Sequence, residues 1–211
     1  PSEMPMQFSN GGEVLSAPNS SNNFEFDPSA DTLGFTKGYN ELLTKRDYER
    51  MVREAATTYG LSLEDANKLV GQMYAESSGD PYAYNPEKGV PSGGLFQVQA
   101  PTALSAGYGT IAYPGYEEQA KEFSKFLETS PSQAEQMQWI RENAPGLIGT
   151  PEDGGTFPAA QVDDIYTPSK NIELAASYMS GLVREFGGDI EKAQAAFNMG
   201  PGAFKNHLSK Y

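Results

Sequence analysis

The stretch Met73-Tyr74-Ala75-Glu76-Ser77-Ser78-Gly79-Asp80-Pro81 places a carboxylate at the end of an apolar helical face. Leu69, Met73 and Glu76 are spaced i, i+4 and i+7, so they share one face of a helix and Glu76 is expected to point inward. Burial disfavours the charged form of a carboxyl group and raises its pKa toward the range in which it donates a proton near neutral pH. The pattern therefore predicts a general acid at Glu76.

Three further motifs follow Glu76-Ser77 along the chain. They are Gly94-Leu95-Phe96-Gln97 with Pro101-Thr102-Ala103, then Tyr166-Thr167-Pro168-Ser169-Lys170-Asn171-Ile172, then Ala195-Ala196-Phe197-Asn198-Met199-Gly200-Pro201-Gly202. In this order they resemble the soluble lytic transglycosylases, whose pattern runs Glu-Ser, Gly-Leu-Met-Gln, Asn-Ile and Ala-Tyr-Asn with Gly-Pro-Gly. Each motif is weak alone, but four in the right order are specific. The resemblance extends from Tyr39 to Tyr211, apart from an inserted middle.

The resemblance implies a lysozyme-like fold in which Glu76 is the catalytic residue. It also implies a set of substrate-binding residues: Ser77, Gly94, Gln97, Phe197 and Asn198. Ser77 would support the Glu76 carboxylate or the substrate, and Gly94 would provide a close-approaching backbone. The amides of Gln97 and Asn198 would bind the sugar, so both are expected to flank Glu76 and to matter little for stability.

The chain departs from the family pattern at three places. Phe96 replaces the usual Met and keeps an apolar wall, whereas Phe197 replaces the usual Tyr and removes a hydroxyl. Many relatives also carry a Tyr beyond Gly-Pro-Gly that approaches the catalytic Glu. Here that role would fall to Tyr211, to a tyrosine between Tyr82 and Tyr116, or to no residue.

Most glycosidases use two carboxylates, whereas only Glu76 lies in a motif here. By resemblance to the lytic transglycosylases, the attacking group is the substrate's own C6 hydroxyl. Glu76 would protonate the oxygen between N-acetylmuramic acid and N-acetylglucosamine and would then accept the C6 proton. The product is a 1,6-anhydromuramyl end, formed without a cofactor, and the partner is the peptidoglycan glycan strand.

The residues leave two alternative functions open. A goose-type-like muramidase would hydrolyse the same bond with water and a second acid, such as Asp80, Glu87 or Asp163. A non-catalytic wall-binding virion module would explain the Phe197 change and the missing C-terminal Tyr. A serine-hydrolase triad has no support, because no motif pairs the single histidine, His207, with a serine.

The composition narrows the function classes. The formal charge of −13 disfavours nucleic acid, because phosphate binding needs clustered Lys and Arg. With no cysteines, the chain has no disulfide, no thiolate zinc site and no lipidated anchor. No motif has metal-ligand spacing, and no apolar run is long enough for a membrane span.

The organisation along the chain predicts a mainly α fold. Residues 1–37 are polar and lack periodicity, which is typical of a flexible arm, and residues 38–211 would form the transglycosylase domain with a helical insertion at about residues 104–165. Helices are expected over 48–59, 62–76, 116–127, 132–143, 171–186 and 189–199. The segment 82–94 is expected to be a loop or short strand-like turns, and 145–159 a loop.

The absent leader, the absent cysteine and the polar arm favour a phage virion protein that opens the host wall in the periplasm, with other virion proteins as partners. The alternative setting is the bacterial periplasm.

Overall fold

The computed structural model describes residues 43–86, 90–148 and 164–210, and the expected arm at residues 1–37 lies outside them. The described part is mainly helical, as predicted. Its helices are α2 (Lys45–Thr58), α3 (Leu63–Ser77), α4 (Ala100–Ser105), α5 (Glu117–Leu127), α6 (Gln133–Asn143), α7 (Pro168–Glu185), α8 (Ile190–Met199) and α9 (Pro201–Leu208), with 3-10 turns η2 (Pro145–Leu147) and η3 (Asp164–Tyr166).

A small antiparallel sheet lies between α3 and α4 in the sequence. Its strands are β1 (Tyr84–Asn85), β2 (Ser92–Gly93) and β3 (Val98–Gln99), in the order β1-β2-β3. Tyr84 pairs with Gly93, and Gly93 pairs with Val98, so the Gly94–Gln97 motif forms the turn between β2 and β3. The sheet therefore presents this motif as a tight loop.

The helix delivering Glu76 is fixed at both ends by local polar groups. The Ser62 side chain accepts from the Asp65 amide at 3.1 Å and caps the N-terminus of the helix. At the other end Ser78 adopts the left-handed conformation with φ of 56° and stops the helix. Lys45 on α2 donates to the Ser78 carbonyl at 2.8 Å.

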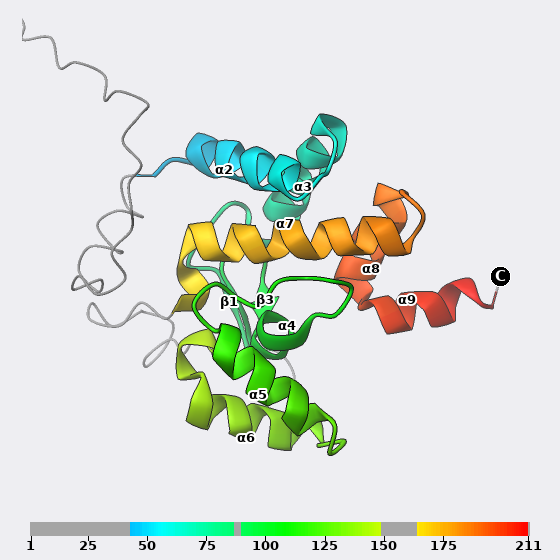
Figure 1. Ribbon diagram of the computed structural model, residues 1–211. Helices are drawn as coiled ribbons and strands as arrows, with labels where there is room; N and C mark the ends of the chain where they lie inside the picture. Colours follow the sequence, from blue (N-terminus) through cyan, green and yellow to red (C-terminus); the bar gives the residue numbers. More distant parts are fainter. Residues whose placement is uncertain (1–42, 87–89, 149–163, 211) are drawn as a thin grey trace, which may run out of the picture. The chain divides into compact units, whose positions relative to one another are not determined.

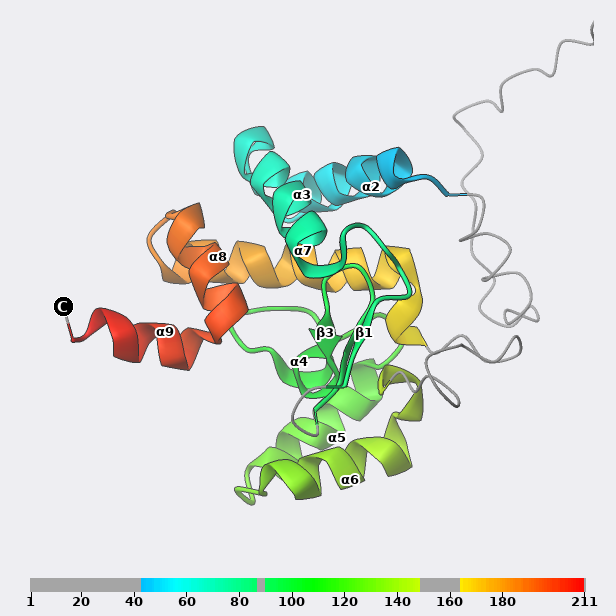
Figure 2. The same cartoon turned by 180° about the vertical axis from the view of Figure 1, so that it is seen from behind.

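Helix α7 is the central element of this fold. It begins at Pro168, three residues before the predicted start at Asn171, because proline is well suited to the first turn of a helix. It packs against α2, α8 and η3 (Figures 1 and 2). Most of its middle is buried on every side, as expected of a helix enclosed by its neighbours.

The predicted insertion contains the two expected helices, α5 and α6. They pack on each other and on α4, and their contact is aromatic: the Phe126 and Trp139 rings stack at 6.1 Å, with Phe123 beside Trp139 at 5.2 Å. Where a loop was expected from Pro145, the chain first makes the 3-10 turn η2; residues 149–163 lie outside the described part. The described residues all belong to one compact unit.

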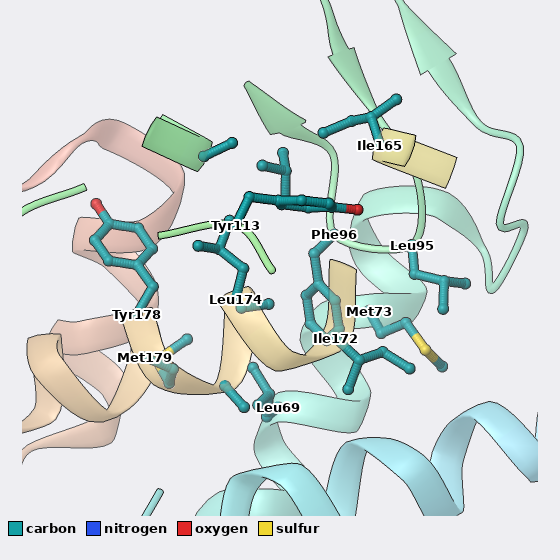
Figure 3. Packing of buried hydrophobic residues seen from close by; sticks show 14 of the residues in the cluster. Leu69, Met73, Leu95, Phe96, Tyr113, Ile165, Ile172, Leu174, Tyr178 and Met179 are labelled. Atoms are coloured by element: carbon teal, nitrogen blue, oxygen red, sulfur yellow. The ribbon is translucent and has the colours of Figure 1, made fainter. Parts of the chain in front are cut away.

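The hydrophobic core joins the helix that carries Glu76 to the motif loop. Figure 3 shows Met73 of α3, Ile172 and Leu174 of α7, and Leu95 and Phe96 of the loop meeting in one cluster. All five side chains are at most 1 % exposed. Burial of each such side chain contributes about 1.5–3 kcal/mol to folding, so the position of the loop relative to α3 is fixed by packing.

Candidate active site

Glu76 lies in the last turn of α3, and its side chain is half-buried. Burial raises the pKa of its carboxyl above the ordinary value of 4.5, and a hydrogen bond from Gln72 partly opposes this rise. Nε2 of Gln72 donates to Oε1 of Glu76 at 2.6 Å. A carboxyl group that keeps its proton to higher pH than usual suits general acid catalysis.

Gln72 connects Glu76 to Asn198, a predicted substrate-binding residue on α8. Nε2 of Gln72 also donates to Oδ1 of Asn198, across 126 positions of sequence. Gln194, one turn earlier on α8, donates to Gln72 Oε1 at 3.4 Å and to the Lys68 carbonyl at 3.2 Å. The structure thus brings Glu76 and Asn198 to one place through a residue that the motifs did not include.

Phe197 precedes Asn198 and is partly buried. Its ring lies 6.4 Å from that of Phe96 in an edge-to-face arrangement and 5.3 Å from that of Tyr178 on α7. These aromatic contacts tie α8 to the motif loop and to α7. Two of the three departures from the family pattern, Phe96 and Phe197, therefore contact each other.

Ser77 contacts the end of its own helix rather than Glu76. Its hydroxyl donates to the Met73 carbonyl at 3.1 Å and accepts from the Gly79 amide at 3.1 Å. Both bonds belong to the turn that ends α3. In this structure Ser77 shapes the chain after Glu76, and its hydroxyl makes no bond to the carboxylate.

The backbone at Gly94 closely approaches other atoms, as expected, but these atoms belong to Ile165 and Asn171 of the protein. Its φ is +78°, and an added Cβ would lie 2.7 Å from the Ile165 carbonyl oxygen and 2.9 Å from Cγ of Asn171. Both distances are shorter than van der Waals contact. A glycine is required here because α7 and η3 press against the loop.

Asn171 binds the motif loop through its fully buried side chain, which is 0 % exposed. Its Oδ1 accepts from the Phe96 amide at 2.9 Å, and its Nδ2 donates to the carbonyls of Gly93 at 3.1 Å and Ile165 at 3.0 Å. One amide thus satisfies three buried backbone groups. The sequence placed Asn171 in a motif without giving it a role.

Gln97 also forms hydrogen bonds within the loop region. Its φ is +47°, its Nε2 donates to the carbonyls of Ala83 and Gly94, each at 3.0 Å, and its Oε1 accepts from Ser92 at 3.1 Å. Both ends of this amide are occupied. Against the expectation from the sequence, we therefore predict that Gln97 matters for stability, because its side chain joins Ala83 next to β1, Ser92 of β2 and the turn.

Alanine substitutions of Gln97 and Asn198 should have different effects. Gln97→Ala removes three hydrogen bonds, although the Ala83 and Gly94 carbonyls each keep a backbone donor. The substitution should lower the free energy of unfolding by about 1–3 kcal/mol, measured by urea denaturation. Asn198 is exposed, so water can replace it as the acceptor of the Gln72 N–H, and Asn198→Ala should lower stability less than Gln97→Ala does. It should instead reduce lysis of peptidoglycan by about ten- to a hundredfold. Equal effects of the two variants on stability would contradict this assignment.

Glu76 also makes stability depend on pH. Because its pKa in the folded state is raised above 4.5, the folded state holds a proton that the unfolded state has lost in the window above 4.5. Stability must then fall as pH rises through that window. Glu76→Gln removes the effect, so its melting temperature should exceed that of the parent at neutral pH, and the difference should shrink below pH 4.5.

The candidate second acids and the candidate tyrosines have the following surroundings in the structure. Asp80 is exposed, and its Oδ1 accepts from the Tyr82 amide at 2.9 Å. Tyr113 and Tyr116 donate to the carbonyl and carboxylate of Asp164, at 2.6 and 2.8 Å. Burial raises the pKa of Tyr84. Glu87, Asp163 and Tyr211 lie outside the described residues.

Among residues 43–86, 90–148 and 164–210, no cluster of three His, Cys, Asp or Glu side chains is arranged to hold a metal ion. In the same part of the chain, no helix combines the length and apolar character needed to cross a bilayer.

Residues 136–211 match the family model described as Transglycosylase SLT domain. No curated protein and no solved structure matches the chain. The matched segment begins at Gln136, inside the expected insertion, and contains Asn171 and Asn198, whereas Glu76 and the Gly94–Gln97 loop precede it. The match confirms the resemblance to the soluble lytic transglycosylases and supports lytic transglycosylase activity on peptidoglycan.

Proposed function

We propose that this chain, which carries a transglycosylase SLT domain, cleaves the β-1,4 bond between N-acetylmuramic acid and N-acetylglucosamine and leaves a 1,6-anhydromuramyl end. One observation carries the proposal. The half-buried Glu76, with its raised pKa, is linked through Gln72 to Asn198 on the segment that matches the family. In this proposal Glu76 is the acid and Asn198 is the sugar-binding amide of one site.

In the proposed reaction one carboxyl group, that of Glu76, acts first as the acid and then as the base. Protonated Glu76 gives its proton to the glycosidic oxygen, so the bond from that oxygen to C1 breaks and N-acetylglucosamine leaves with a new hydroxyl. The acetamido carbonyl of N-acetylmuramic acid stabilises the positive charge that develops at C1. The C6 hydroxyl oxygen then bonds to C1, and its proton returns to the Glu76 carboxylate. No water is consumed.

The mass of the product tests this proposal directly. Digestion of purified peptidoglycan should release fragments that end in 1,6-anhydromuramic acid, each lighter by one water than a hydrolysis product. Mass spectrometry separates the two. Fragments with reducing N-acetylmuramic acid ends would instead identify a muramidase, for which the exposed Asp80, four residues after Glu76, is the candidate second acid.

The biological setting is a separate proposal. We propose that the chain is a phage virion protein that opens the host wall in the periplasm, supported by the absence of cysteine and the polar composition of residues 1–37. Antibodies against the chain should detect it in purified phage particles. Detection only in the periplasm of uninfected bacteria would overturn this setting without affecting the proposed reaction.

A further inference from the structure

Gln72 lies at the site although no family motif quoted above contains it. It lies one helical turn before Glu76, and only 4 % of its surface is exposed. A glutamine so deeply buried next to a half-buried glutamate needs hydrogen-bond partners for all its polar atoms. Its partners define what it does.

The hydrogen bonds of Gln72 favour one orientation of its amide. When Glu76 is ionised its carboxylate can only accept, so in that state the NH2 group of Gln72 faces Glu76. The same nitrogen has a second N–H, which is donated to Oδ1 of Asn198, and the oxygen of Gln72 accepts from Gln194. Turning the amide round would set its oxygen against two acceptor oxygens.

This orientation fixes Asn198 as well. Because Oδ1 of Asn198 accepts from Gln72, its NH2 group is directed elsewhere, and in the described part of the chain that group makes no hydrogen bond. Asn198 is exposed, so its two N–H donors are available to a ligand. The ligand group that meets Asn198 is then an acceptor, such as the carbonyl of an acetamido group.

No charged side chain in the described residues forms an ion pair or hydrogen bond with Glu76. On α3 itself, Lys68 pairs with Glu64 and with Glu191 of α8. On α2, Arg53 pairs with Glu49, Arg50 pairs with Asp47 and Glu54, and Lys45 donates to the Ser78 carbonyl, while Arg46 acts electrostatically on Glu49. On α8, Lys192 pairs with Asp189. The direct polar control over Glu76 therefore comes from Gln72.

We infer that Gln72 is a positioning residue for the proposed reaction: it holds the Glu76 carboxyl and turns the Asn198 amide so that its N–H donors face the glycan. The inference rests on the proposed function. Gln72 does not touch the reacting atoms itself, so its loss should change the pH dependence and the rate of cleavage rather than abolish them.

Two substitutions with opposite expected signs test the inference. Gln72→Met keeps the shape but removes the donor, so the charged form of Glu76 is less stabilised and the alkaline limb of kcat/KM on soluble glycan strands should move to higher pH. Gln72→Lys keeps a donor and adds a positive charge, so the limb should move to lower pH. Both should reduce kcat about ten- to a hundredfold, because the carboxyl is held less well.

The matched control is Gln136→Met on α6, where the same side chain is half-buried and bonds only the Pro131 carbonyl at 3.1 Å. Its pH profile should equal that of the parent. Asn198→Asp, which keeps the acceptor and loses the donors, should raise KM. The inference would be overturned if the alkaline limb of the kcat/KM profile stayed at the parent's pH in both Gln72 variants. It would also be overturned if Asn198→Asp had the same KM as the parent.

A second measurement separates this inference from the proposed reaction. Carboxyl-carbon NMR titration of Glu76, assigned by the signal missing in Glu76→Gln, reports its pKa without any catalysis. The pKa should rise in Gln72→Met and fall in Gln72→Lys even if the chain cleaves nothing. If both variants titrate like the parent, Gln72 does not control Glu76, whatever the outcome of the lysis assays.

Discussion

Glu76→Gln should abolish lysis of purified peptidoglycan while the domain remains folded. The amide matches the carboxyl group in size and still accepts the hydrogen bond from Gln72, but it has no acidic proton to donate. General acid–base catalysis contributes roughly 10²- to 10⁴-fold, and here one residue provides both steps. The loss should appear as a flat turbidity trace, with a circular dichroism spectrum like that of the parent.

The control is Glu49→Gln, which changes a half-buried glutamate on α2. Glu49 accepts from Tyr74 at 2.9 Å and pairs with Arg53 at 3.3 Å, so it contacts the same helix, but it lies outside the proposed site. Its lysis rate should stay within a few-fold of the parent. Near-parental lysis by a folded Glu76→Gln protein would remove the acid assignment and leave the non-catalytic wall-binding module as the better explanation.

Asn171→Leu should cause the largest loss of stability. The substitution keeps the branched arrangement of four heavy atoms but removes the partner that Asn171 provides to the Phe96 amide and to the Gly93 and Ile165 carbonyls. Each unpaired buried group costs about 1–3 kcal/mol, so the free energy of unfolding should fall by about 3 kcal/mol or more. Urea denaturation measures the change in the free energy of unfolding. A variant that is already unfolded without urea would also support the prediction.

A matched asparagine serves as the control. Asn67 is exposed on α3 and only accepts from Arg53 at 2.8 Å, so Asn67→Leu should change stability by no more than about 0.5 kcal/mol. If Asn171→Leu were as mild as this control, Asn171 would not connect the loop to α7, and the position of the loop would rest on apolar packing alone.

Much of the helical framework was predictable because its signals are local. Spacing identified α2, α3 and α5 to α8, and the expected ranges 62–76 and 189–199 begin at the residues that cap α3 and α8, Ser62 and Asp189. Two short helices, α4 and α9, were missed, although each carries a proline in its first turn. Elements of two turns offer too few positions for periodicity, so only the proline signalled them.

The site was only partly predictable because its contacts are long-range. The inward position of Glu76 follows from one helix, and Gln72 could have been found at i−4 to Glu76, where side chains on a helix meet. Its bond to Asn198 could not. Likewise, the motif indicates that another group lies close to the Gly94 backbone. The sequence does not reveal whether that group is a ligand or the Asn171 side chain.

The two ends of the segment that carries α5 and α6 lie close together in the structure. The Tyr113 amide donates to the Ala103 carbonyl at 2.8 Å, and the Tyr113 hydroxyl donates to the Asp164 carbonyl at 2.6 Å, so a single residue joins the exit to the return. Closing a longer excursion between fixed ends costs only about 0.6 kcal/mol for each doubling of its length. A change in the length of this excursion should therefore cost little stability while Glu76 and its partners stay where they are.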